Sequence, residues 1–119
     1  MLTLPPSTRV FVATQPADMR RSFDGLMALV RDFLGEDPLS GHLFVFRNKA
    51  GDRLKVLWWD RDGLAIFYKR LEEGSFSFPK SRDAARLEMS AADLQLVLQG
   101  IDPAKVSRAK RYQRPTAAT

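Results

Sequence analysis

The segment from Ser40 to Pro79 constrains the fold of this chain more than any other part of the sequence. Apolar and aromatic runs alternate there with short charged turns, and most of the aromatic residues lie within it. Short β-branched and aromatic runs separated by Asn, Asp and Gly are typical of antiparallel hairpins. The segment therefore predicts a meander of four strands joined by three turns, with Ser75–Phe78 as the last strand.

One further strand and two helices are predicted outside the meander. Arg9–Ala13 is a β-branched and aromatic run bounded by proline-containing segments, which predicts a first strand. From Pro16 to Gly35, apolar residues recur at helical spacing, with proline suited to the first turn and glycine to the C-terminal cap. Ser90 predicts the N-cap of a shorter helix that Gly100 closes.

Together these elements predict a single α+β domain, an antiparallel sheet of about five strands with one long and one shorter helix packed on it. At 119 residues and 45% hydrophobic, the chain suffices for one core and is short for two ordinary domains. We expect this domain to occupy residues 1–102, followed by a flexible basic tail over residues 103–119. No apolar run approaches the roughly 20 residues that span a bilayer, and the first residues lack a leader pattern, so we expect a cytoplasmic location without membrane contact.

The excess positive charge of the chain is concentrated at its C-terminal end. Residues 1–102 contain 14 Lys and Arg against 14 Asp and Glu, whereas the last 17 residues contain five Lys and Arg and no acidic residue. Clustered cations of this kind neutralise the phosphates of nucleic acids and release condensed counterions. We therefore predict DNA contacts from Lys105, Arg108, Lys110, Arg111 and Arg114. The alternative is a solvated terminus that keeps the protein soluble.

The meander adds cations and aromatic rings that suit a nucleic-acid or protein partner. They interleave along the chain, as in sheets that stack unpaired bases on exposed rings. We expect supporting phosphate contacts from Arg47, Lys49, Arg53 and Lys55. Trp58 and Trp59 are adjacent and therefore point to opposite faces of a strand, so one of them could lie outside the core. Together with Tyr68, these two residues are the candidates for a partner contact.

The composition argues against an enzyme. The chain has no cysteine and a single histidine, His42, which removes disulfides, thiolate zinc sites and histidine-dependent triads. A nuclease would need carboxylates that converge on Mg²⁺, and the candidates are Asp60 and Asp62 with Glu72 and Glu73 across a possible hairpin. Both pairs also fit ordinary turn sequences. We expect no catalytic residue, no metal and no cofactor, with a cryptic nuclease as the alternative and His42 as a strand-edge or core residue.

Four stretches of the chain, taken in order and spacing, are more specific than any single motif. They are Asp18–Leu26, Ser40–Asn48, Lys55–Gly63 and Tyr68–Glu72. With them the sequence resembles the short accessory protein, of the TnpB or second-open-reading-frame type, of insertion-sequence-66-family bacterial transposons. This group is unrelated to the RNA-guided nuclease that shares the TnpB name.

The resemblance implies a non-catalytic accessory factor in DNA transposition, encoded beside a larger DDE-type transposase, and it transfers no catalytic residues. It implies DNA, the transposase or both as partners. The alternative is a module that binds the transposase without direct DNA contact. An exposed edge strand could also pair two copies of the chain into a homodimer.

Overall fold

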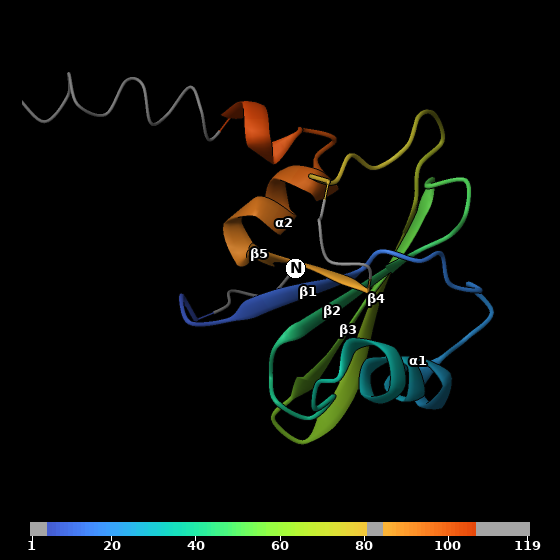
Figure 1. Ribbon diagram of the computed structural model, residues 1–119, viewed down its shortest axis with the longest axis vertical. Helices are drawn as coiled ribbons and strands as arrows, with labels where there is room; N and C mark the ends of the chain where they lie inside the picture. The colour runs from blue at the N-terminus through green and yellow to red at the C-terminus, as the bar shows by residue number, and fades with distance from the viewer. Residues whose placement is uncertain (1–4, 81–84, 107–119) are drawn as a thin grey trace, which may run out of the picture.

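A computed structural model describes residues 5–80 and 85–106 of the chain (Figure 1). Five strands form one sheet in the order β4-β3-β2-β1-β5. The strands are β1 Arg9–Ala13, β2 Leu43–Arg47, β3 Arg53–Asp60, β4 Gly63–Arg70 and β5 Arg86–Ser90. The helices are α1 Phe23–Leu29, which continues into the π-helical segment η1 Val30–Leu34, and α2 Ala91–Leu98. The prediction of a small domain with five strands and two main helical elements is confirmed.

The sheet is mixed, so the prediction of a purely antiparallel sheet is wrong. β1 runs parallel to β2, with Phe11 opposite Phe44, and antiparallel to β5. Parallel neighbours need a crossover connection of a dozen residues or more, and α1 with η1 forms that connection. β2, β3 and β4 keep the antiparallel pairing expected of the meander.

The prediction of a strand at Ser75–Phe78 is also wrong. The segment bonds to the β2–β3 turn, where the Phe76 N–H donates to the Gly51 carbonyl at 2.8 Å. Gly51 has a φ of 77°, and a Cβ there would lie 3.3 Å from the Cβ of Ser75, so the close approach favours glycine. Phe76 is 6% exposed. The segment therefore covers one face of the sheet, and the fifth strand is β5, beside β1.

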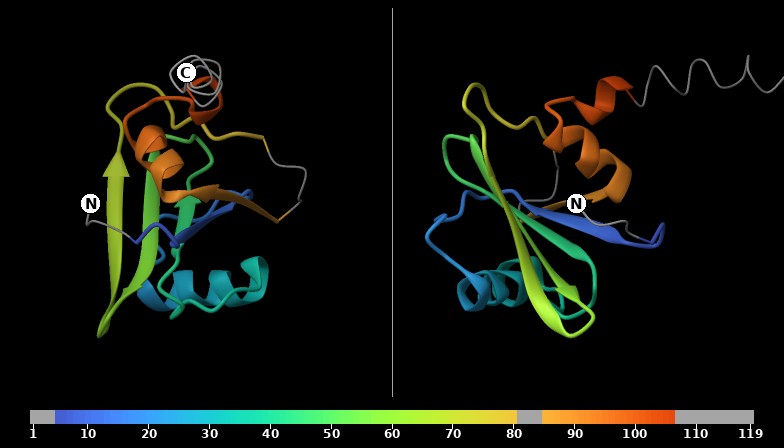
Figure 2. Two further views of the ribbon diagram at one scale, coloured as in Figure 1. Left: turned by 90° about the vertical axis from the view of Figure 1, so that its left-hand side faces the viewer. Right: turned by 180° about the vertical axis from the view of Figure 1, so that it is seen from behind.

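Helices cover both faces of the sheet, as Figures 1 and 2 show. Under α1 and η1, the core contains Leu26, Val30, Leu34, Phe11, Phe44, Phe46 and Leu57. Under α2 and the segment around Phe76, it contains Val10, Val12, Leu43, Val45, Leu54, Val56, Trp58, Leu94 and Val97. The central strands therefore send alternate side chains into two cores, and the apolar run of β2 is covered on both sides.

The long helix begins at Phe23, whereas the periodicity predicts a start near Pro16. The Asp18 carboxylate accepts hydrogen bonds from the backbone N–H of Arg20 at 2.9 Å and from its guanidinium at 2.7 Å. Such local side-chain bonds compete with helix formation. The Ala17 N–H also donates to the Arg47 carbonyl at 2.8 Å, which fixes this segment to the end of β2.

The predicted helix caps are confirmed. Gly35 ends η1 with a left-handed φ of 65°. The Ser90 hydroxyl accepts the N–H of Asp93 at 3.1 Å at the start of α2, and the N–H of Gly100 donates to the carbonyl of Val97 after its end. Among the described residues, no helix is long and apolar enough to cross a membrane.

Candidate nucleic-acid interface

Cationic side chains gather at the end of the sheet where β2 ends, β3 begins and β4 ends. The pairing of β3 with β4 places Arg53 directly opposite Arg70. Lys49 is exposed in the β2–β3 turn. Like charges that face each other on neighbouring strands destabilise a sheet. We call Lys49, Arg53 and Arg70 the basic end, and its geometry suits an anion.

Arg53, Tyr68, Arg70 and Glu72 line a shallow hollow of about 430 Å³ at this end. Arg53, Lys55 and Leu57 are two residues apart along β3, so their side chains point to the same face of the sheet. Leu57 packs in the core under α1, and Arg53 therefore lies on the face that α1 covers. Glu72 reaches Arg70 at 3.6 Å, and both side chains are mostly exposed. A long exposed ion pair of this kind contributes little, so the hollow keeps a net positive charge.

Lys55 lies beside this hollow but is 8% exposed. Its Nζ donates to the Arg21 carbonyl at 2.7 Å and lies 4.7 Å from the centre of the Tyr68 ring. Lys69 is also engaged, because its Nζ donates to the Leu98 carbonyl at 2.9 Å, near the end of α2. Carbonyls at helix C-termini lack helical partners and favour cations. Both lysines therefore have structural partners.

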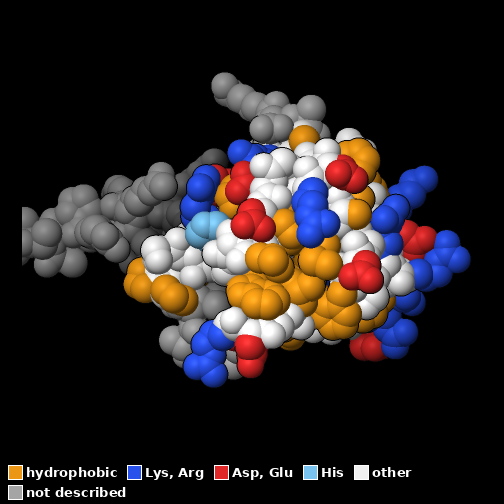
Figure 3. Space-filling model, turned by 90° about the horizontal axis from the view of Figure 1, so that it is seen from below, with side chains coloured by type: hydrophobic (Ala, Val, Ile, Leu, Met, Phe, Trp, Pro, Cys, Tyr) orange, Lys and Arg blue, Asp and Glu red, His pale blue; other side chains and the backbone are white. Residues whose placement is uncertain are grey.

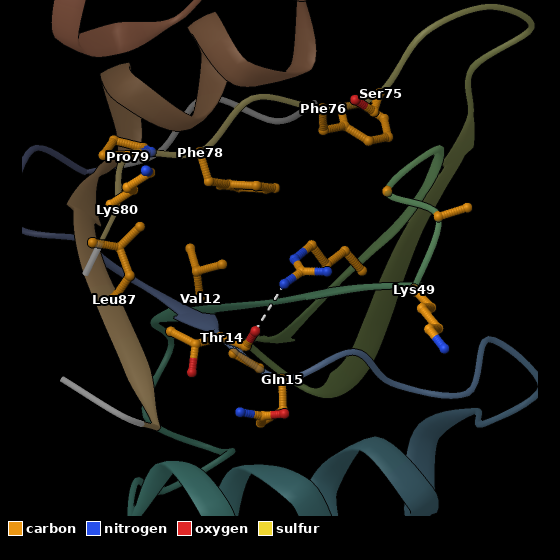
Figure 4. Close-up of a pocket in the computed structure, with 14 residues that line it drawn as sticks. Val12, Thr14, Gln15, Lys49, Ser75, Phe76, Phe78, Pro79, Lys80 and Leu87 are labelled. Atoms are coloured by element: carbon orange, nitrogen blue, oxygen red, sulfur yellow. Dashed lines mark hydrogen bonds between the residues drawn. The ribbon is translucent and has the colours of Figure 1, made fainter. Parts of the chain in front are cut away.

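A larger cleft of about 660 Å³ opens on the opposite face, between the ends of β1 and β2 and the segment around Phe78 (Figure 4). The Arg47 guanidinium donates to the Thr14 carbonyl at 2.8 Å within it. Lys49 and Lys80 lie on opposite sides of its opening. Within the part of the chain that the structure describes, its lining residues include these three cations and no acidic side chain. We call this opening the Arg47 cleft.

The predicted contact residues are only partly brought together. Arg47, Lys49 and Arg53 lie around one end of the sheet. Lys105 is exposed in a helical turn at residues 103–106, which begins where the Asp102 carboxylate accepts the N–H of Ala104 at 3.0 Å. The remaining predicted contacts lie outside the described residues: Arg108, Lys110, Arg111 and Arg114.

The aromatic candidates differ in their exposure. Trp58 is 9% exposed and belongs to the core under α2, whereas Trp59 is half-buried and alternates to the other face. Tyr68 is 47% exposed. Trp59 and Tyr68 therefore have surface that a partner can reach, and Trp58 has almost none.

Two cations of this region, Arg70 and Lys80, were not among the predicted residues. The sequence does contain a signal for Arg70. A two-residue turn after Asp60 pairs Asp60 with Gly63, and counting back along both strands from this pair places Arg70 opposite Arg53. Lys80 has no comparable signal, since its position depends on how the segment after β4 returns across the sheet.

The carboxylates considered for a nuclease do not converge. Asp60 and Asp62 lie at the β3–β4 turn, whereas Glu72 and Glu73 follow the far end of β4. The eight residues of β4 separate the two pairs by roughly 25 Å, at about 3.3 Å per residue. Within residues 5–80 and 85–106, no group of three His, Cys, Asp or Glu side chains could hold a metal ion. The four residues therefore do not form a metal site.

Other polar groups near the sheet have structural partners. The Nδ1 atom of His42 accepts the backbone N–H of Arg9 at 3.0 Å, and its ring lies edge-on to Phe11. The Arg9 guanidinium bonds Glu88 at 2.7 Å and lowers the pKa of that carboxyl. Hydrogen bonds from Arg20 lower the pKa of Asp18 to about 2. His42 is thus a strand-edge residue bonded to the backbone, as expected.

The face seen from below in Figure 1 carries a gathering of apolar side chains, which Figure 3 displays. Phe33 of η1 is 67% exposed, although it is one of the apolar residues that recur at helical spacing between Pro16 and Gly35. The π-helical turn changes the angular spacing of its residues, so a residue expected inside can point outward. Phe33, Leu29, Pro16 and Ala17 line an apolar groove of about 320 Å³.

The chain belongs to the IS66 Orf2-like family, whose model matches residues 8–108. It is 46% identical over 108 residues to the uncharacterized protein y4jC of Sinorhizobium fredii, an alignment that covers 91% of each chain. It is 42% identical over 102 residues to the uncharacterized protein y4hO of the same organism, covering 86% of this chain and 88% of that protein. No solved structure gives a significant match. Family membership makes this a transposition-associated accessory protein of an insertion sequence.

Proposed function

We propose that the protein is a non-catalytic accessory factor that binds DNA phosphates through its basic end. The observation that carries the proposal is the direct opposition of Arg53 and Arg70 across β3 and β4. Among the described residues, no acidic side chain pairs with Arg53, and Arg70 has only its 3.6 Å contact to Glu72. A phosphate between the two guanidinium groups relieves their repulsion and accepts hydrogen bonds from both.

The surroundings support a site for an extended polyanion. Lys49 is exposed in the adjoining turn, and Lys105 is exposed on the helical turn beyond α2. The bond from Lys69 to the Leu98 carbonyl holds the end of α2 beside the end of β4, so the helical turn that carries Lys105 follows an element fixed at this end of the sheet. Four further cations of the C-terminal segment remain sequence predictions: Arg108, Lys110, Arg111 and Arg114.

Fluorescence anisotropy of labelled duplexes across a salt series tests the proposal. The duplexes carry either a transposon-end sequence or an unrelated sequence. Each phosphate contact contributes about 0.9 to the slope of log K against log salt, so Arg53→Gln/Arg70→Gln should reduce the slope by about 1.8. A slope of about 1.8 from two phosphate contacts means that these contacts strengthen binding roughly 60-fold more at 0.1 M salt than at 1 M salt.

The matched control is Arg31→Gln/Arg61→Gln, which removes the same charge from exposed positions on η1 and the β3–β4 turn. It should change the slope much less than the variant of the basic end. A third variant with Gln at Arg108, Lys110, Arg111 and Arg114 measures the share of the C-terminal segment. Absence of wild-type binding at low salt, or equal effects of the two double variants, would contradict the proposal.

A second candidate function is contact with the DDE-type transposase encoded beside proteins of this family. The exposed Phe33 and the apolar groove beside it favour this function, because exposed apolar patches often mark protein interfaces. An apolar interface is nearly independent of salt, unlike phosphate binding. Phe33→Ser should weaken binding to purified transposase of the same element and leave DNA binding unchanged. Pairing of two copies through an exposed edge strand, β4 or β5, stays a prediction, which sedimentation velocity can test.

A further inference from the structure

The Arg47 cleft has the size and shape of a small-ligand site. Its volume is about 660 Å³, within the range of roughly 300–1,000 Å³ that is usual for such sites. It opens on the sheet face opposite to the hollow of Arg53 and Arg70, and the two have no lining residue in common. The cleft shares Lys49 with the basic end, and its other lining residues lie outside the basic end.

The charge of the cleft suits an anion. The Arg47 guanidinium is half-buried and donates to two neutral acceptors, the Thr14 carbonyl at 2.8 Å and the Asn48 carbonyl at 3.4 Å. These bonds hold the group in place without neutralising its charge. Lys49 and Lys80 extend from the two sides of the opening. Because the described residues that line the cleft include no acidic side chain, the three cations attract a phosphate.

The wall of the cleft suits a flat apolar surface. The Phe78 ring projects into the opening, with Val12 and Leu87 on the adjacent wall (Figure 4). Phe78 is half-buried, so part of its ring faces the space. The exposed Gln15 side chain lies across the cleft from Phe78, with an amide that can donate and accept hydrogen bonds. An aromatic face with a nearby amide can stack and hydrogen-bond a nucleobase.

We propose that the Arg47 cleft binds one unpaired nucleotide of DNA, with its base against Phe78 and its phosphate beside Lys49 and Lys80. A paired base lies within the duplex stack and cannot enter such a cleft, so the site selects strands that are single, bulged or frayed. The inference rests on the proposed DNA binding and adds a preference for unpaired bases. That preference depends on residues outside the Arg53–Arg70 pair.

Anisotropy on two labelled duplexes that differ by one bulged thymine tests the inference. The wild type should bind the bulged duplex about tenfold more tightly than the perfect one, since stacking on an aromatic side chain is worth about that factor. Phe78→Ala should remove this preference and leave the affinity for the perfect duplex unchanged. Phe78→Leu keeps the apolar packing without the flat ring and should behave in the same way. Phe33→Ala, at an exposed ring on the α1 side, is the matched control and should change neither affinity.

Further arms separate the outcomes. The first arm is competition with thymidine monophosphate. If this free nucleotide displaces the bulged duplex at equal concentration, the ligand of the cleft is a free nucleotide, and the inference that it binds a nucleotide of a DNA strand is overturned. Equal wild-type affinity for both duplexes, with salt-dependent binding retained, would overturn the inference and leave the proposed function intact. Absence of any DNA binding by the wild type would overturn both the inference and the proposed function. Arg53→Gln/Arg70→Gln should weaken binding to both duplexes by the same factor.

Discussion

Replacing Lys55 by Met distinguishes a buried structural lysine from a surface contact with DNA. The change removes a charged hydrogen bond to the Arg21 carbonyl, worth about 1.5–3 kcal/mol, and a cation–π contact with Tyr68, worth about 0.5–1 kcal/mol. Met recovers about 1–2 kcal/mol, because its apolar side chain gains from burial and no ammonium has to leave water. The net expectation is a loss of about 1–2 kcal/mol in the free energy of unfolding.

Urea unfolding followed by the fluorescence of the two tryptophans measures this loss. With a slope of about 1.5 kcal/mol per molar urea for a domain of this size, the midpoint should fall by roughly 1 M. Lys49→Met, at an exposed turn position, is the control and should change the free energy of unfolding by no more than about 0.5 kcal/mol. DNA affinity should follow the opposite order, with Lys49→Met weakening binding and Lys55→Met leaving it unchanged.

The reasoning would be refuted if Lys55→Met unfolded at the wild-type midpoint and bound DNA more weakly. The Lys55 ammonium would then be solvent-facing in the native protein, as the sequence pattern alone suggests. The contacts to Arg21 and Tyr68 would contribute nothing measurable.

Three further changes test the local chemistry. Arg20 holds the pKa of Asp18 at about 2 against an ordinary 3.8, so this carboxylate stabilises the fold above pH 3.8 and stops doing so as the pH falls through 2. Urea titrations should therefore show the stability gap between wild type and Asp18→Asn closing over that range. Arg61 has a φ of 58°, and Arg61→Gly should raise the free energy of unfolding by about 0.5 kcal/mol, the relief of left-handed strain less the entropy cost of glycine. Ser90→Ala removes the cap of α2 and should cost about 1 kcal/mol by thermal or urea unfolding.

Features encoded by local chemistry could be predicted from the sequence. The apolar run of β2, the cap at Ser90 and the left-handed Gly35 follow from residue type and spacing, and the structure contains all three. The two-residue turn after Asp60 also fixes the register of β3 and β4. The cationic pair of Arg53 and Arg70 therefore follows from the sequence, although only Arg53 is among the predicted contact residues.

Features decided by distant partners could not be predicted. Nothing within β1 specifies that its neighbours are a parallel β2 and a much later β5, because either edge of a strand can pair. The alternation of Ser75–Phe78 is typical of a strand, but its backbone bonds to the β2–β3 turn. Lys55 resembles a solvent-facing lysine in the sequence, and only the packing of Arg21 and Tyr68 around it makes it internal.

The position of β1 between β2 and β5 has a consequence for how the chain is made on the ribosome. Among the described strands, β1 is the first along the chain and its partner β5 is the last, and the ion pair between Arg9 and Glu88 joins residues 79 positions apart. Until β5 emerges, one edge of β1 stays unpaired beside the apolar Val10 and Val12. An open apolar edge recruits strands from other chains. Products of interrupted translation that stop before Arg86 should therefore aggregate, so the solubility of each newly made copy depends on the last strand to be synthesised.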